Sequence, residues 1–106
     1  MRILHDYQGR AVRLTDERLA HILEHPEMQG LEQAIEDTLL TPARVVQSLS
    51  DPGARLYYRY YVGSVAGDKF LCVVVKFDID TDDAFVLTAY LTDEIKKGTE
   101  IWPTSA

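Results

Sequence analysis

Two histidines, His21 and His25, lie four residues apart and directly before Pro26. In a helix, this spacing places both imidazoles on neighbouring turns of one side. Imidazole exchanges a proton near neutral pH, so the pair is suited to general acid and base catalysis. The alternative is two surface histidines, one of which closes the helix at the end where a positive charge is favoured.

A second set of candidate groups consists of Lys76, Thr88 and Tyr90. Alternate residues of a strand point to the same side of a sheet, so these three side chains can share one face. The lysine offers a cation and the other two offer hydroxyl groups. Together with the imidazoles they would form an acid–base site for phosphate chemistry. The alternative is a solvated lysine at a strand end beside two good strand formers.

Segment 57–61 contains four tyrosines around Arg59. Strand alternation sends Tyr57, Arg59 and Tyr61 to one face. A guanidinium group flanked by aromatic rings can hold a phosphate while bases stack on the rings. These three residues are therefore the predicted substrate-binding residues. Aromatic packing between neighbouring strands is the alternative.

Two metal-binding patterns are incomplete in this chain. Residues 21–25 match the H-x-x-E-H pattern of zinc proteases, but a catalytic zinc needs a third protein ligand and nothing points to one. The acidic segment 78–83 resembles the start of a calcium loop. However, Asp83 stands where glycine is required, and Ala89 stands in place of the bidentate glutamate. We expect no metal and no cofactor.

The composition is that of one globular domain spanning residues 1–106, with 46% hydrophobic and 26% charged residues. A formal net charge of −6 argues against a protein that coats DNA, and it leaves room for a basic protein partner. The single cysteine, Cys72, excludes an internal disulfide. No apolar run approaches a membrane span of roughly 20 residues, and the start lacks a secretory signal. We expect a cytoplasmic protein.

Local patterns predict an α+β fold, in which two N-terminal helices pack on one face of a three- to four-stranded antiparallel sheet. Thr15 is a plausible N-cap of the first helix, which ends at Pro26, and the second runs from Gly30 to Thr41. One strand is expected to begin at 45–46 and to end at the turn 50–53. Further strands are expected at 55–62, 69–77 and 84–92, with turns at 63–68 and 78–83. Residues 94–97 suggest one helical turn, and 2–5 with 11–14 suggest a short hairpin or a loose arm.

Symmetric hairpin pairing predicts which face of the sheet contacts the helices. The predicted helix-packing face carries Tyr58, Tyr60, Leu71, Val73, Val75, Phe77, Phe85, Leu87, Ala89 and Leu91. The predicted open face carries Tyr57, Arg59, Tyr61, Cys72, Val74, Lys76, Val86, Thr88 and Tyr90. All candidate site residues except the histidines are therefore expected on the open face.

Several short motifs together resemble small prokaryotic and phage-associated proteins of the barnase/EndoU/colicin/RelE-like nuclease fold. They are Leu-Thr at 14–15, His-Ile-x-x-His-Pro-Glu at 21–27, the Tyr-Arg strand, Val-Val-Val-Lys at 73–76 and Thr-Ala-Tyr at 88–90. The resemblance extends from Leu14 to about Trp102. It implies helices followed by a four-stranded antiparallel sheet.

The resemblance also implies metal-independent cleavage of RNA, in which the ribose 2′-hydroxyl attacks the adjacent phosphate. The resemblance assigns the catalytic roles to five residues, namely His21, His25, Lys76, Thr88 and Tyr90. Arg59 takes the basic position of the Tyr-Arg strand. We predict a ribonuclease-fold toxin or phage-linked effector with a cognate antitoxin or immunity protein. The alternative is a catalytically inert module of the same fold that binds protein or RNA.

Overall fold

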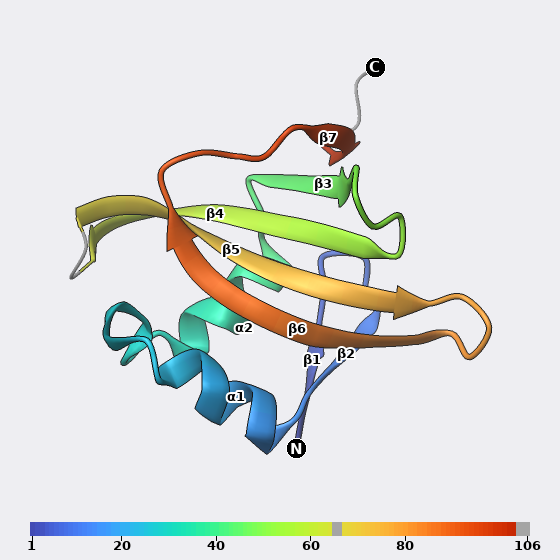
Figure 1. Cartoon of the computed structure of the whole chain (residues 1–106), viewed down its shortest axis with the longest axis horizontal. Coiled ribbons are helices and arrows are strands. Elements are labelled where there is room, and N and C mark those ends of the chain that lie inside the picture. Colours follow the sequence, from blue (N-terminus) through green and yellow to red (C-terminus); the bar gives the residue numbers. More distant parts are fainter. Residues whose placement is uncertain (65–66, 104–106) are drawn as a thin grey trace.

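The computed structural model describes residues 1–64 and 67–103, which form one mixed sheet, two α-helices and a short 3-10 helix (Figure 1). The elements are β1 (Arg2–His5), β2 (Ala11–Leu14), α1 (Asp16–Leu23), η1 (Pro26–Met28), α2 (Glu32–Leu40), β3 (Arg44–Ser48), β4 (Ala54–Ser64), β5 (Gly67–Asp78), β6 (Asp83–Thr92) and β7 (Gly98–Trp102). The order of strands in the sheet is β1-β2-β6-β5-β4-β3-β7.

The two helices begin near the residues that the local sequence predicts, but α1 ends at Leu23 rather than at Pro26. His25 therefore lies outside the helix that carries His21. The Thr15 side chain accepts a hydrogen bond from the backbone nitrogen of Arg18, which confirms it as the N-cap of α1. Asp16 in the first turn suits the positive end of the helix dipole. A 3-10 turn begins at Pro26, and α2 begins two residues after Gly30, which has a φ of +82°.

The expected fold, with two N-terminal helices on a three- to four-stranded antiparallel sheet, is wrong because seven strands of the described chain join one mixed sheet. The β1–β2 hairpin precedes the helices and pairs with β6 in parallel through Arg13 and Phe85. An ion pair supports this contact, with Arg13 Nε 2.9 Å from Asp83 Oδ1. Residues 98–102 form β7 on the outer side of β3, and residues 94–97 form no helical turn.

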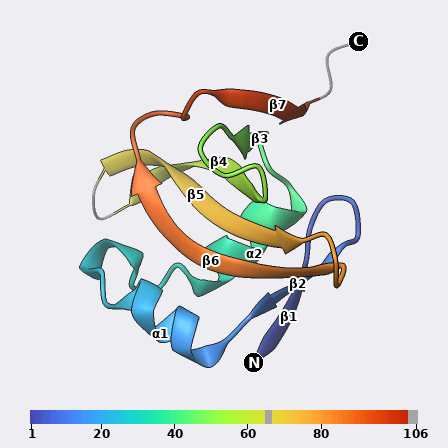
Figure 2. The same ribbon diagram turned by 45° about the vertical axis from the view of Figure 1, so that its right-hand side comes forward.

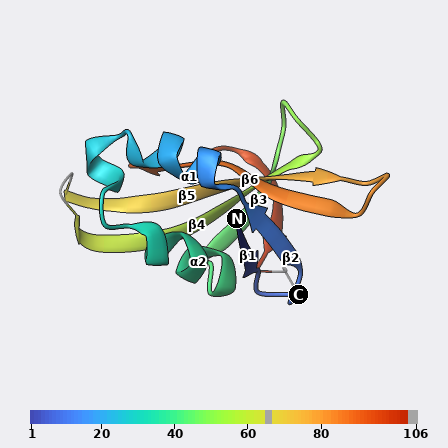
Figure 3. The ribbon, with the colours of Figure 1, turned by 90° about the horizontal axis from the view of Figure 1, so that it is seen from below.

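The main core lies between the sheet and the two helices. Helix α2 contacts β1, β4 and β5, while α1 lies along β6. Figure 3 shows α2 on one side of β4 and the loop between β3 and β4 projecting from the other. Ile22, Ile35 and Leu39 of the helices belong to one buried cluster with Val73 and Val75 of β5. Among the described residues, no helix is long and apolar enough to cross a membrane.

The predicted facing of β4 is wrong by one residue. Tyr57 pairs with Val73 and belongs to the helix-packing face, whereas Tyr58 pairs with Cys72 and belongs to the opposite face. The register of this hairpin shifts between Tyr61 and Ser64, which the assumption of symmetric pairing did not include. Residues 65 and 66 of the predicted turn lie outside the described residues.

A bulge in β6 reverses the predicted facing of its first half. Val74 pairs with Thr88, but Val75 pairs with Val86, so Leu87 is the extra residue. Val86 therefore joins the core, while Phe85 lies opposite Lys76. The rest of the predicted helix-packing face is confirmed, namely Leu71, Val73, Val75, Phe77, Ala89 and Leu91.

Candidate functional site

A second apolar cluster covers the face of the sheet opposite α2. Its buried members are Val46, Leu56, Tyr58 and Cys72, with Phe70, Val74, Tyr90 and Ile95 packed around them. The segment between β6 and β7 crosses this cluster, and the backbone nitrogen of Lys96 donates to the Tyr58 hydroxyl over 3.1 Å. This contact holds Lys96 above the sheet.

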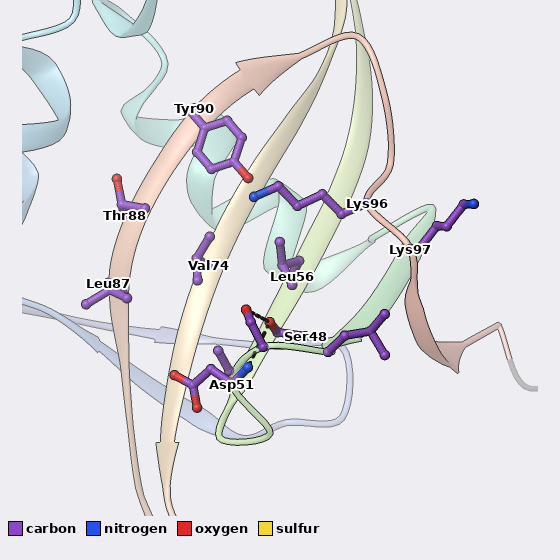
Figure 4. A pocket seen from close by; sticks show the side chains of 12 residues that line it. Ser48, Asp51, Leu56, Val74, Leu87, Thr88, Tyr90, Lys96 and Lys97 are labelled. Carbon is purple, nitrogen blue, oxygen red and sulfur yellow. Dashed lines mark hydrogen bonds between the residues drawn. The ribbon is translucent and has the colours of Figure 1, made fainter.

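A pocket of about 400 Å³ lies beside this cluster (Figure 4). We call it the open-face pocket. Leu56 and Val74 lie on its floor, with Tyr90 beside them on β6. The loop after β3 forms another wall, in which the Ser48 hydroxyl bonds Ser50 and accepts from the backbone nitrogen of Asp51. The lining residues are Ser48, Leu49, Ser50, Asp51, Ala54, Leu56, Val74, Leu87, Thr88, Tyr90, Lys96 and Lys97. The pocket therefore combines an apolar floor with hydroxyl groups and cations.

The lysines around this pocket differ in their surroundings. In Figure 4, Lys96 reaches over the sheet toward Tyr90, whereas Lys97 points away. Neither forms an ion pair in the part of the chain that the structure describes. Lys76 is bound to Asp51, and this hydrogen bond holds the pKa of that carboxyl below its usual value. Lys96 is thus the cation that remains available to a ligand.

The predicted catalytic residues are only partly brought together. Thr88 and Tyr90 line the open-face pocket, and Lys76 contacts it through Asp51. His21 and His25 do not line it, and their side chains are 68% and 63% exposed. The Nδ1 atom of His21 lies 3.6 Å from a carboxylate oxygen of Glu24, and that of His25 lies 4.0 Å from Glu27.

The predicted substrate-binding residues lie on the opposite face of the sheet. Tyr57 donates its hydroxyl hydrogen to Asp6 over 2.8 Å, and Tyr61 donates to the carbonyl oxygen of Ala34 over 3.3 Å. Arg59 donates to the carbonyl oxygen of Asp37 at the end of α2. In this structure, all three side chains hold α2 or the β1–β2 turn against the sheet.

The thiol of Cys72 lies between two hydroxyl groups beneath the pocket. Burial raises the pKa of this thiol to about 11, although the Tyr90 and Tyr58 hydroxyls act in the opposite direction. Burial also raises the pKa of Tyr58 to about 12 and that of Tyr90 further. All three groups are therefore protonated near neutral pH, and none is a ready nucleophile or base.

Cys72 is expected to resist alkylation in the folded protein. The thiol is fully buried and, at about pH 8, almost entirely protonated, whereas iodoacetamide reacts with the thiolate. Mass spectrometry should detect labelling only after unfolding in guanidinium chloride, which also serves as the control. Rapid stoichiometric labelling of the native protein would contradict the burial described above.

Among the described residues, no group of three His, Cys, Asp or Glu side chains lies close enough to hold a metal ion. The zinc alternative, built on His21, Glu24 and His25, therefore has no third ligand within this part of the chain. Comparison with protein-family models, curated proteins and solved structures finds no match for this chain. The resemblance to a nuclease fold stays a prediction.

Sequence reasoning missed Lys96, the cation that reaches over the floor of the pocket. Lys96 was assigned to a helical turn, but residues 95–97 belong to no helix or strand and cross the second apolar cluster. The floor residue Leu56 was also missed, since the predicted register of β4 placed it on the helix-packing face.

Proposed function

We propose that the protein is a non-catalytic module that binds a nucleotide unit of RNA in the open-face pocket. The observation that carries this proposal is the position of Lys96, which extends over an apolar floor toward Tyr90. Its ammonium group would bind the phosphate, while the base would lie on Leu56 and Val74 beside the Tyr90 ring. A volume of about 400 Å³ falls within the range of small-ligand pockets.

The charge of the molecule limits the proposal to a short ligand. A formal net charge of −6 opposes binding of a long phosphate backbone, so one nucleotide unit is favoured over an extended strand. The proposal includes a cytoplasmic location, where RNA is present and a lone buried thiol needs no disulfide partner.

Binding can be tested by fluorescence anisotropy with short labelled single strands of RNA and DNA, and by titration with free adenosine monophosphate. We expect saturable binding that Lys96→Ala weakens at least about tenfold, because a charged hydrogen bond is lost. Lys69→Ala is the matched control, since it removes the same charge from a lysine that is paired with Asp93 outside the pocket. Equal weakening by both substitutions, or no binding of any probe, would overturn the proposal.

The same samples test the ribonuclease activity expected from the sequence. RNA incubated with the protein in EDTA should stay intact, because neither exposed histidine lines the open-face pocket. Cleavage by the native chain that is lost in His21→Ala and in Lys76→Ala would replace the binding proposal with the catalytic one.

A further inference from the structure

Two arginines lie over one aromatic ring at the end of the sheet remote from α1. The guanidinium carbon of Arg10 lies 4.9 Å from the centroid of the Phe77 ring, and that of Arg55 lies 4.7 Å from it. A pocket of about 290 Å³ opens beside them and is lined by residues of the β1–β2 and β5–β6 turns and of the loop before β4. Figure 2 shows the β1–β2 and β5–β6 turns at the same side of the molecule. Arg55 and Phe77 belong to the helix-packing side of the sheet, so this arginine pocket is separate from the open-face pocket.

Neither guanidinium group has a hydrogen-bonded or ion-paired side-chain partner within residues 1–64 and 67–103. The other arginines do have polar partners: Arg2 with Glu32, Arg13 with Asp83, Arg18 with the Leu87 carbonyl, Arg44 with Glu100, and Arg59 with Asp37 and Thr41. The two unpaired charges repel each other across the same ring. An anion that accepts hydrogen bonds from both guanidinium groups would remove this repulsion.

One buried donor near these arginines also lacks a partner among the described residues. The Tyr7 hydroxyl is buried and has no hydrogen-bond partner. The nearby buried carboxylate, Asp6, already accepts from the Tyr57 hydroxyl and from the backbone nitrogens of Gln8 and Arg10. Arg55 and Arg10 both lower the pKa of Tyr7, which burial and Asp6 raise, so the two cations lie near this hydroxyl. The two guanidinium groups are therefore donors without an acceptor among the described residues, and a bound anion would supply one.

We infer that the arginine pocket binds a phosphate group through Arg10 and Arg55. One guanidinium can satisfy both oxygens of a carboxylate with a bidentate pair of hydrogen bonds. Two guanidinium groups instead match a tetrahedral anion that has more oxygens and more charge. Stacking on Phe77 holds both groups in place before the ligand arrives, which reduces the entropy lost on binding.

Acidic residues of the β5–β6 turn limit the affinity of this site. Asp83 is neutralised by Arg13, and Asp78 accepts from the backbone nitrogen of Asp80. Asp82 also lines the pocket and is exposed, with a positive φ of 54°. Asn tolerates this backbone conformation as Asp does, so Asp82→Asn removes one repulsive charge without straining the turn. This substitution is expected to strengthen phosphate binding.

The test is a titration of the full chain with inorganic phosphate at constant ionic strength, followed by heteronuclear NMR. We expect saturable shifts of the Arg10, Arg55 and Phe77 side-chain signals, with acetate acting more weakly. Arg10→Ala should weaken binding about tenfold, and Arg55→Lys should also weaken it because the planar fork is lost. Arg44→Ala is the control, because Arg44 of β3 is paired with Glu100 of β7 and does not line the arginine pocket. This substitution should leave phosphate binding unchanged.

Three outcomes would overturn the inference. They are the absence of saturable shifts, equal phosphate binding by Arg10→Ala and the native chain, and tighter binding of acetate than of phosphate. Lys96→Ala separates this inference from the proposed function. Phosphate shifts at the arginine pocket should persist in that variant even where nucleotide binding is lost.

Discussion

Replacing Asp6 with alanine is expected to lower the free energy of unfolding by about 3–5 kcal/mol. Asp6 is only 2% exposed, and its carboxylate accepts three hydrogen bonds. Two come from the backbone of the β1–β2 turn and one comes from Tyr57 on β4. The substitution would remove the acceptor for all three and leave the Tyr57 hydroxyl buried without a partner. Urea denaturation measures the loss directly.

A matched control and a double-substitution cycle sharpen this prediction. Asp68→Ala also removes an aspartate that accepts a backbone hydrogen bond, here from Gly63 of β4, but Asp68 is exposed, so a loss below about 1 kcal/mol is expected. In a Tyr57→Phe background, Asp6→Ala should cost less than in the native chain, because no hydroxyl is left unsatisfied. Equal costs in the two backgrounds would show that the two side chains are not coupled.

Gly98→Ala is expected to displace β7 and to lower the free energy of unfolding by about 2–3 kcal/mol. A Cβ atom at this position would lie less than 3.0 Å from the carbonyl oxygen of Gln47 and from Cγ1 of Val46. Both neighbours belong to β3, and Ser48 of β3 pairs with Gly98. The backbone of one strand must therefore move.

The single tryptophan of the chain reports this displacement. Trp102 ends β7, and its ring lies 5.1 Å from that of Tyr7, so the emission spectrum should change when β7 moves. Gly53→Ala is the control, because its new Cβ would meet only the flexible end of Lys76 at 3.2 Å and the Asp51 carboxylate at 3.4 Å. Native emission and native stability in Gly98→Ala would contradict the close packing of β7 on β3.

Local signals were sufficient for the helices and for most strands. The Thr15 cap and the prolines after each helix set the ends of the helices to within a few residues, independently of the rest of the protein. Likewise, the continuous apolar run at 70–75 predicted β5, and hairpin pairing predicted the side on which Val73 and Val75 are buried. These features depend on neighbours in the sequence, which is why they could be predicted.

Fewer strands were predicted than the sheet contains, because the remaining strand pairings are long-range. The parallel contact of β2 with β6 joins Arg13 to Phe85, and no local pattern encodes such a pairing. The short strand β7 resembles a tail until β3 is present to pair with it. The Leu87 bulge and the shifted β4–β5 hairpin then reversed the predicted facing of several side chains, since one extra residue turns a strand over.

The candidate site was predicted in part for the same reasons. Thr88 and Tyr90 line one pocket, although the bulge at Leu87 changes what surrounds them. Tyr57, Arg59 and Tyr61 were assigned to the open face only because the register of β4 was off by one. Their hydrogen bonds to Asp6, Asp37 and Ala34 serve the packing of the main core.

The contact between Tyr7 and Trp102 joins the two margins of the sheet. These rings belong to the turn after β1 and to the end of β7, which are the outermost strands in the order of pairing. An open sheet would normally fray from each margin separately. Here, loosening of either margin removes a packing partner from the other, so the amide hydrogens of both strands should exchange with solvent in a single concerted opening.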